Sequence, residues 1–425
     1  MTRDRGLAAY IAVTAAYWGF MLTDGALRML VLLHFHALGF SPVQLAYLFV
    51  LYEVAGIITN SSAGWIAARF GLASTLFSGL ALQIIALHML TQLDPSWAVA
   101  ASVAFVMCVQ GLSGVAKDLS KMSAKSAVKL LAPSEGGALF KWVAVLTGSK
   151  NAVKGLGFLV GAALLALFGF ETAVFAMAVL LTVVFIALLL RMPKGLPAGR
   201  KSAKFKEVFS KNRNINWLSF SRVFLFGARD VWFVVGIPIY FYAVLSDGTA
   251  EGNRAAFFMI GTFMAIWVIL YGAVQAVAPK LLGAKTRALC DLLRDARVWG
   301  AALIVIPAAL AAAVYSAESP TIWLTLTIVT GLLVFGAIFA VNSSLHSFLI
   351  LAFSTDQRVT MDVGFYYMAN AAGRLLGTLL SGATYQVGGL PLCLGTAAIL
   401  LGLNVFGVSR LQSETSSVQD SPSCT

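Results

Sequence analysis

The sequence predicts an all-α membrane protein with about twelve transmembrane helices in two pseudo-symmetric halves of six helices each. Of its 425 residues, 59% are hydrophobic and only 11% are charged, and the mean hydropathy is +0.86. A soluble domain of this length needs far more charge to cover its surface. Apolar runs of about twenty residues, enough to cross the hydrocarbon core of a bilayer, recur along the whole chain.

Turn sequences rich in glycine, proline, serine and aspartate separate these apolar runs, among them GFSP, LDPSW and AESP. The first run is too long for a cleaved signal peptide, so we expect it to be the first span. The predicted spans lie near residues 8–33, 43–67, 72–91, 97–118, 138–166, 170–191, 214–243, 255–279, 297–315, 320–350, 361–386 and 389–409.

Lysine and arginine concentrate in alternate loops, whereas the opposite loops together hold only Arg254. Cytoplasmic loops of membrane proteins carry the excess of basic residues, so we expect both termini in the cytoplasm. Eight basic residues fall in the central stretch RMPKGLPAGRKSAKFKEVFSKNR. RNA binding by this stretch is the alternative interpretation, but a topology signal explains it better. We therefore expect a lipid bilayer as the surroundings and no nucleic acid as a partner.

The central basic stretch divides the chain into an N-terminal half (1–191), a cytoplasmic linker (192–213), a C-terminal half (214–411) and a cytoplasmic tail (412–425). Short internal similarities indicate a duplication. TDGALRMLVLLHFHAL aligns with RDVWFVVGIPIYFYAV, which places Asp24 opposite Asp230. KGLGFLVG aligns with RLLGTLLS, which places Lys154 opposite Arg374 and Gly157 opposite Gly377. Chance is the competing explanation, but a duplicated transporter fold predicts matches at these spans.

Several ionisable residues lie inside the predicted spans, where an unpaired charge is costly and marks a polar site or an ion pair. Interior cations outnumber interior acids by two. The cations are Arg28, Lys150, Lys154, Arg229 and Arg374, and the acids are Asp24, Glu53 and Asp230. Four further residues, Lys117, Asp118, Lys121 and Arg222, are expected nearer the cytoplasmic ends, where long side chains can reach water.

Lys150 and Lys154 lie one helical turn apart on one face, where two ammonium groups repel each other. A pocket for a multiply charged anion explains this pair, and neutralisation by Glu53 and Asp230 from neighbouring helices is the alternative. Asp24 and Arg28 have the same spacing and are expected to form an ion pair that an oxyanion opens.

Arginine at positions 229 and 374 adds forked donors suited to phosphate-like groups. On the fourth span, Lys117 and Lys121 begin a lysine stripe with a four-residue period. This stripe predicts an entry path that concentrates an anion at the cytoplasmic mouth, with ordinary anchoring as the alternative.

Enzymes and ATP-driven pumps are excluded by what the chain lacks. It contains no phosphate-binding loop, no HExxH motif and no Ser/His/Asp constellation. The four cysteines form no CxxC pair, and the histidines have no metal-site spacing. We therefore expect no cofactor and no metal.

The stretch GWIAARFG (64–71) resembles the loop signature of the major facilitator superfamily. Gly64, Arg69 and Gly71 match that signature, but Ala68 stands where the family usually has an acidic residue. The resemblance implies the fold of that superfamily, with twelve helices in two six-helix halves, and leaves its usual inter-helix charge lock in doubt.

Four longer stretches, LTDGALRMLVLLHFHALGFSP, SGVAKDLSKMSAKSAVK, WVAVLTGSKNAVKGLGF and FLFGARDVWFVV, resemble the organoarsenical efflux permeases of the ArsJ family, a branch of that superfamily. They cover the first half and the seventh span best. The resemblance implies export of 1-arseno-3-phosphoglycerate across a bacterial inner membrane. It also implies glyceraldehyde-3-phosphate dehydrogenase as the functional partner that makes this compound, so that the two together confer arsenate resistance.

On this basis the substrate is expected to enter past Lys117 and Lys121. It is then expected to bind between the halves at Arg28, Lys150, Lys154, Arg229 and Arg374. Gating or proton coupling is expected of Asp24, Glu53, Asp118 and Asp230. Antiport and facilitated exit both remain open. The alternatives are an organophosphate or phosphoglycerate exchanger of the same fold and a membrane receptor without transport.

Overall fold

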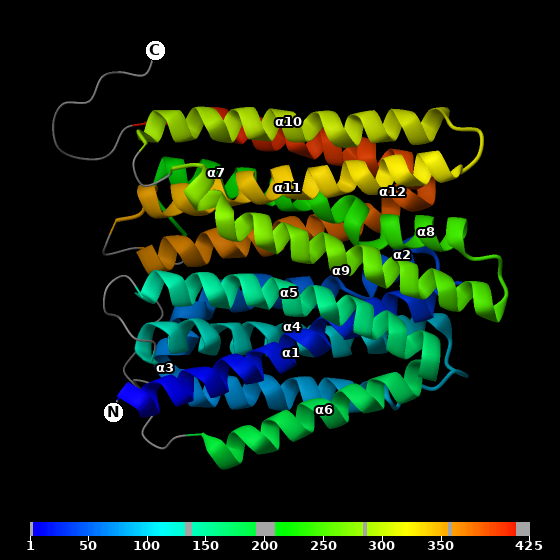
Figure 1. Cartoon of the computed structure of the whole chain (residues 1–425), viewed down its shortest axis with the longest axis horizontal. Coiled ribbons are helices and arrows are strands. Elements are labelled where there is room, and N and C mark those ends of the chain that lie inside the picture. The colour runs from blue at the N-terminus through cyan, green and yellow to red at the C-terminus, as the bar shows by residue number, and fades with distance from the viewer. Residues whose placement is uncertain (1–2, 132–137, 193–208, 284–286, 356–358, 414–425) are drawn as a thin grey trace.

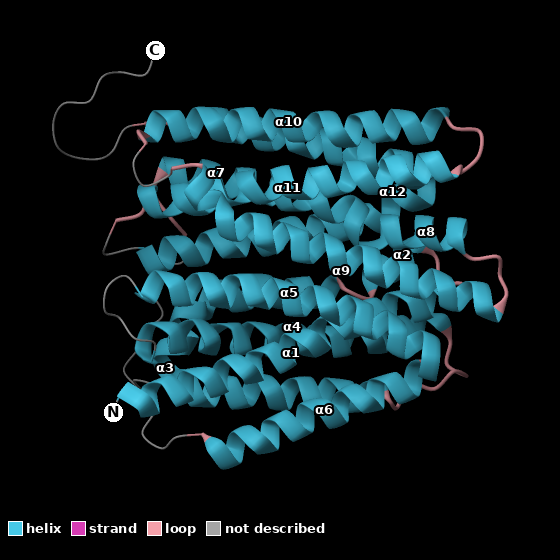
Figure 2. Ribbon diagram, in the orientation of Figure 1, coloured by secondary structure: helices cyan, strands magenta, loops and turns pink. Residues whose placement is uncertain are grey.

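The computed structural model describes residues 3–131, 138–192, 209–283, 287–355 and 359–413. The predicted linker falls outside the described residues over 193–208, and so does the predicted tail over 414–425. Throughout the described ranges the regular structure is helical, and Figure 2 shows the helices side by side in one bundle. The elements are α1 (Arg3–Ala37), α2 (Pro42–Tyr47), α3 (Val50–Leu90), α4 (Val99–Leu131), α5 (Ala138–Phe168), α6 (Phe170–Arg191), α7 (Arg213–Val231), the π-helical segment η2 (Trp232–Gly236), α8 (Ile237–Leu245), α9 (Ala250–Leu281), α10 (Leu289–Ser316), α11 (Ile322–Phe353) and α12 (Val359–Ser409).

Two of these helices contain a reversal at glycine. Gly71 in α3 has φ 77°, and Gly389 in α12 has φ 63°, a backbone region that glycine enters without steric cost. A straight α12 of 51 residues would be about 75 Å long, more than twice the thickness of the hydrocarbon core. Figure 1 shows instead that the chain doubles back, from orange to red.

The described residues contain eleven helical segments long and apolar enough to cross a membrane. The last segment, Met361–Ser409, holds the reversal at Gly389 and therefore crosses twice. The prediction of about twelve spans is confirmed, and so is the break that separates the last two.

Helices of the two halves meet along two seams. Within the halves, α1 packs on α5, α3 on α4, and α7 on α12. Between them, α5 packs on α9, and α3 packs on α12. Figure 1 shows α1 and α3 to α6 in the lower part of the bundle and α7 to α12 in the upper part, with α2 beside α8. The all-α fold with two six-helix halves is as predicted.

Glycines allow α1 and α5 to approach until their backbones touch. A Cβ atom at Gly25 would lie 2.5 Å from the Lys154 carbonyl oxygen, and one at Gly157 would lie 2.5 Å from that of Leu22. Gly157 therefore serves close helix packing. This contact matters for the site because it brings Lys154 beside the part of α1 that carries Asp24.

The matching helices of the second half approach in the same way. A Cβ atom at Gly377 of α12 would lie 2.5 Å from the Gly227 carbonyl oxygen of α7 and 2.7 Å from Cβ of Asp230. Gly157 and Gly377 therefore each lie against the backbone of the first helix of their own half.

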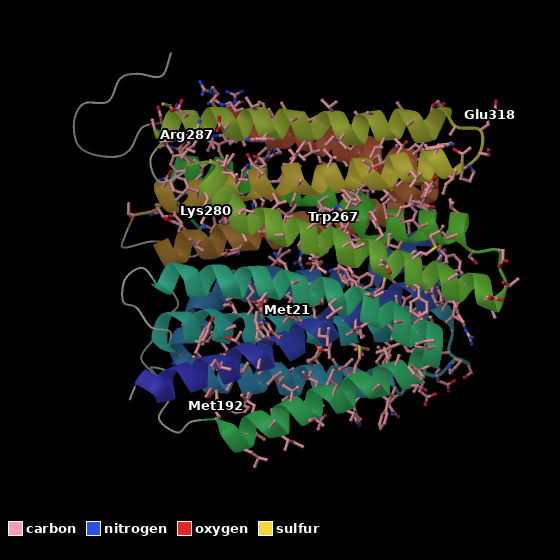
Figure 3. The ribbon with its side chains drawn as sticks, viewed as in Figure 1. Met21, Met192, Trp267, Lys280, Arg287 and Glu318 are labelled. Atoms are coloured by element: carbon pink, nitrogen blue, oxygen red, sulfur yellow. The ribbon has the colours of Figure 1, made fainter. Side chains whose placement is uncertain are left out.

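The bundle has a basic end, defined here as the end at which α1 begins and α12 finishes. Figure 3 shows Lys280 and Arg287 at this basic end, and Glu318 at the opposite end. Both chain-terminal helices reach the same end because the number of crossings is even. This arrangement agrees with the alternation of basic loops in the sequence.

Candidate functional site

Ionisable side chains from five helices meet in the interior of the bundle. The acids among them are buried, whereas the side chains of Arg28, Lys154 and Arg374 keep 15%, 19% and 19% of their surface exposed. We call this set the central charge cluster. It comprises Asp24, Arg28, Glu53, Lys117, Asp118, Lys121, Lys154 and Arg374.

Asp24 of α1 is bound by two donors from other helices. Its Oδ2 lies 2.7 Å from Nζ of Lys154, and its Oδ1 accepts a hydrogen bond of 2.6 Å from the Tyr52 hydroxyl. The expected ion pair with Arg28 is wrong. The close approach of α1 and α5 offers Asp24 a lysine from the facing helix, and Arg28 turns to another acid.

That other acid is Glu53 of α3, which is fully buried between two arginines. Oε1 of Glu53 lies 3.4 Å from Nη1 of Arg28, and Oε2 accepts a hydrogen bond of 2.8 Å from Nε of Arg374. A second Arg374 nitrogen, Nη2, also contacts Oε2. Arg374 comes from the second half, so this forked ion pair joins the two halves.

Tyr52 is a functional candidate that sequence reasoning missed. Its ring centroid lies 3.9 Å from Nζ of Lys117, 5.5 Å from Cζ of Arg28 and 5.9 Å from Cζ of Arg374. Among the described residues, Lys117 has no carboxylate oxygen within 4.0 Å, and the ring face is a direct attractive contact for its ammonium group. A tyrosine directly before an intramembrane glutamate was the available signal.

Asp118 holds together the residues of the central charge cluster that lie nearer the basic end. It accepts hydrogen bonds from Thr59 Oγ1 at 2.5 Å and Asn60 Nδ2 at 3.3 Å, and its Oδ1 lies 3.2 Å from Nζ of Lys121. Lys121 also donates to Asn60 Oδ1 at 2.8 Å, and its Nζ lies 5.3 Å from the ring of Tyr367 in the second half.

We expected Lys117 and Asp118 near the end of a span, where side chains reach water. This expectation is wrong, because the two residues are only 7% and 0% exposed. The predicted fourth span ended at residue 118, but α4 continues to Leu131. Polar and basic residues in this stretch concealed the helix because they lower its hydropathy. Lys117 and Asp118 thus lie in the helix interior and join the central charge cluster.

Arg229 and Asp230 of α7 bind each other. Nε of Arg229 donates to Oδ1 of Asp230 at 2.6 Å, and the guanidinium lies over the ring of Phe226 at 4.7 Å. The alternative in which Asp230 and Glu53 neutralise the lysines is wrong, because both acids pair with arginines. The two halves also differ in their ion pairs. Lys154 pairs with Asp24 of its own half, whereas its counterpart Arg374 pairs with Glu53 of the other half.

The remaining predicted cation, Lys150, lies on α5 one turn from Lys154 toward the basic end and is half-buried. The next residue, Asn151, donates to Gln275 of α9 across the seam between the halves at 3.3 Å. The turn of α5 that carries Asn151 therefore contacts the second half.

The central charge cluster holds five cations and three carboxylates, so it carries two positive charges more than its acids neutralise. Nη2 of Arg28 is buried and has no hydrogen-bond partner among the described residues. Such a set binds oxyanions, which accept several charge-assisted hydrogen bonds at once. Within the described ranges, no group of three histidine, cysteine or acidic side chains is suited to hold a metal ion.

Solved structures of two kinds of transporter have the same fold as this chain. The chain superposes on the nucleoside transporter NupG with a TM-score of 0.68 at 15% identity, covering 97% of this chain and 98% of that one. A point mutant of NupG gives 0.68 at 16% identity, with 96% and 98% covered. A POT family transporter in complex with 5-aminolevulinic acid gives 0.68 at 14% identity, with 95% of each chain covered. At these identities the likeness concerns the fold.

Sequence comparison identifies the family. No curated protein sequence matches the chain. The family model described as Major Facilitator Superfamily matches residues 9–350, which is most of the chain. The chain therefore belongs to the major facilitator superfamily, and it is a multi-pass membrane transporter and not an enzyme.

Proposed function

We propose that this transporter exports a small organic anion with two oxyanion groups, and that its substrate is 1-arseno-3-phosphoglycerate. One observation carries the proposal: Glu53 is bound at once by Arg28 of the first half and Arg374 of the second half. A phosphate or arsenate oxyanion, like this carboxylate, is a negatively charged acceptor that takes several guanidinium hydrogen bonds, so it competes for both guanidinium groups.

The surplus charge of the central charge cluster supports an anionic substrate. Within the part of the chain that the structure describes, an incoming oxyanion finds a donor without a partner in Nη2 of Arg28 and a cation without a carboxylate partner in Lys117. Lys154, paired with Asp24, supplies a further ammonium that is partly exposed. Lys150 and Lys121 extend the basic surface toward the basic end, where we propose that the substrate enters from the cytoplasm.

Exchange of ion pairs supplies the coupling between binding and movement. The pair between Glu53 and Arg374 crosses from one half to the other, so it must break when the halves rock apart. Asp230 lies against Gly377, one turn from Arg374, and is the acid available to Arg374 within its own half. Substrate that replaces Glu53 breaks this cross-half ion pair and shifts the conformational equilibrium through its differential affinity.

The specific substrate follows from the resemblance of the first half and the seventh span to organoarsenical permeases. In this proposal glyceraldehyde-3-phosphate dehydrogenase forms 1-arseno-3-phosphoglycerate in the cytoplasm of a bacterium. The transporter in the inner membrane then removes it, with both termini cytoplasmic, and the result is resistance to arsenate. Asp24, Glu53, Asp118 and Asp230 are the groups available for proton coupling.

The test is uptake of enzymatically generated arseno-phosphoglycerate into everted membrane vesicles. Arg28→Ala and Lys154→Ala are expected to lower the initial rate at least tenfold, because each removes a charge-assisted bond to the oxyanion. Arg294→Ala is the matched control, since this arginine is 69% exposed at the basic end. Normal insertion with full transport in both pocket variants contradicts the proposal.

A phosphoglycerate exchanger is the second candidate, because the same cations bind a phosphate. Strong competition by plain 3-phosphoglycerate, together with counterflow of that compound in liposomes, favours the exchanger. Absence of any flux in liposomes favours a receptor without transport. Arsenate resistance that appears only when the dehydrogenase is co-expressed favours the organoarsenical substrate.

A further inference from the structure

The C-terminal half also contains a buried arginine that lies outside the central charge cluster. Arg222 of α7 is 4% exposed and lies within the span Arg213–Leu245. The expectation that its side chain reaches water at the end of the span is therefore wrong. Among the described residues, Arg222 has no carboxylate oxygen within 4.0 Å, so its charge is not neutralised by an ion pair.

The described residues that hold this guanidinium are all neutral. Nε of Arg222 donates to Oδ1 of Asn370 at 3.2 Å, and Nη1 donates to the hydroxyl and the carbonyl oxygen of Ser343 at 3.0 and 3.3 Å. The planar group also lies 4.1 Å from the ring centroid of Phe226 and 4.8 Å from that of Tyr366. These contacts fix the orientation of the guanidinium and leave its charge in place. A buried, uncompensated cation in a membrane span is costly unless an anion visits it.

A second observation points to a ligand at the same place. His346 of α11 is fully buried, and neither of its ring nitrogens has a hydrogen-bond partner among the described residues. It follows Ser343 by three positions, so the two side chains lie on one face of α11. An oxyanion bound by Arg222 would satisfy this imidazole, which otherwise leaves its polar atoms unpaired in an apolar interior.

The position of Arg222 relative to the central charge cluster is set by α12. Its partner Asn370 precedes Arg374 by four residues, which places the two side chains on one face and separates them by about 6 Å along the helix. Arg222 thus contacts α12 one turn before Arg374, on the same face of that helix. A three-carbon chain separates oxyanion groups at its two ends by a comparable distance.

We propose that Arg222, Ser343 and Asn370 form a second anion subsite, which binds the far oxyanion of a two-ended substrate while the central charge cluster binds the near one. The inference rests on the proposed function and adds a selection rule to it. A substrate with one anionic end fills only the central charge cluster, whereas one with two ends fills both places.

The experiment measures binding of two stable anions to the purified full-length protein by calorimetry. 3-Phosphoglycerate has two anionic ends, and glycerol 3-phosphate has one. For the wild type, the first is expected to bind at least tenfold more tightly. Arg222→Gln is expected to abolish most of that difference by weakening 3-phosphoglycerate alone, while Arg222→Lys retains part of it.

Two further variants keep the test sharp if Arg222→Gln fails to fold. Ser343→Ala and Asn370→Ala remove single contacts of the guanidinium and are expected to reduce the preference several-fold in the same direction. Lys280→Gln, an exposed cation at the basic end, is the control and should leave both affinities unchanged.

The outcomes separate this inference from the proposed function. If the Arg222 variants lower the affinity for both anions equally, Arg222 has a structural role, and the subsite alone is overturned. Unchanged affinities overturn it as well. If the wild type binds neither anion, the subsite is overturned, whereas the proposed function is decided separately by uptake of arseno-phosphoglycerate into vesicles.

Discussion

Glu53 and Arg374 form an ion pair between the two halves of the transporter, with Nε of Arg374 2.8 Å from Oε2 of Glu53. The carboxylate is fully buried and also holds Arg28 at 3.4 Å. One acid thus restrains two cations that would otherwise repel each other inside the bundle. Any ligand that displaces this acid acts on both halves at once.

Replacing Glu53 with glutamine is expected to destabilise the ligand-free protein by about 3–5 kcal/mol, because two buried guanidinium groups lose their counter-charge. Added 3-phosphoglycerate should restore more thermal stability to this variant than it adds to the wild type, since the anion then supplies the missing charge. Thermal unfolding followed by tryptophan fluorescence, with and without the anion, measures both effects.

The control for that comparison is Glu171→Gln, an exposed acid in the first turn of α6. It should change neither the unfolding temperature nor its response to the anion. A Glu53→Gln variant that is as stable as the wild type and no more responsive to the anion would remove the basis for charge competition at this site.

The ion pair between Asp24 and Lys154 should show strong energetic coupling in a double-mutant cycle. Each single change, Asp24→Asn or Lys154→Met, leaves one buried group without its partner, whereas the double variant leaves neither charge unpaired. We expect a coupling energy of about 1–3 kcal/mol in stability measured by unfolding in denaturing detergent.

Arg287 and Asp295 supply a matched surface pair, with Nη1 of Arg287 2.6 Å from Oδ2 of Asp295 and 33% and 20% of their side chains exposed. Solvent screens this pair, so its cycle should give less than about 1 kcal/mol. Equal coupling energies at the two sites would mean that the interior pair is solvated as well as the surface one.

Tyr52 contributes a hydrogen bond and a ring face, and two substitutions separate these roles. Tyr52→Phe removes only the 2.6 Å bond to Asp24 and should lower anion affinity by no more than about tenfold. Tyr52→Leu also removes the ring that faces Lys117 and Arg28, so a clearly larger loss is expected. Identical losses in the two variants would exclude a role for the ring.

The sequence was sufficient to predict the helical spans and the breaks between them. Apolar length fixes membrane crossings, and the predicted break between the spans 361–386 and 389–409 coincides with the reversal seen at Gly389. The predicted end of the fourth span was wrong because the lysines at every fourth position from 117 to 129 lower the hydropathy of a continuous helix. Helix length and hydrophobic length differ wherever a span lines a polar interior.

The members of the site were largely predictable, but their pairing was not. Asp24 and Arg28 have the spacing of a local ion pair, yet each pairs with a residue of another helix. The partner of Asp24 depends on how closely α1 and α5 approach, and Gly25 and Gly157 permit this close approach. Arg222 was placed near water for a related reason: distance along a span is readable from sequence, but the cover provided by neighbouring helices is not.

The basic end is expected to face the cytoplasm, and cysteine labelling tests this. In a variant without native cysteines, Glu318→Cys at the opposite end should react with a membrane-impermeant maleimide in intact cells. Lys280→Cys should react only after permeabilisation, because Figure 3 places these two exposed residues at opposite ends of the bundle. The reverse labelling pattern would invert the proposed topology and the direction of entry.

Close contact between paired helices is the feature that positions both Lys154 and Arg374, and alanine substitutions test it. A methyl group at Gly157 would meet Leu22, and one at Gly377 would meet Gly227, each at 2.5 Å from a carbonyl oxygen. Both substitutions should therefore lower stability and transport together, by several-fold in rate, although neither glycine touches substrate. Gly402→Ala is the control, because nothing lies within 4 Å of the added methyl and alanine favours a helix by up to about 1 kcal/mol. Full transport by the Gly157→Ala and Gly377→Ala variants would show that the charged residues keep their places without the close helix contacts.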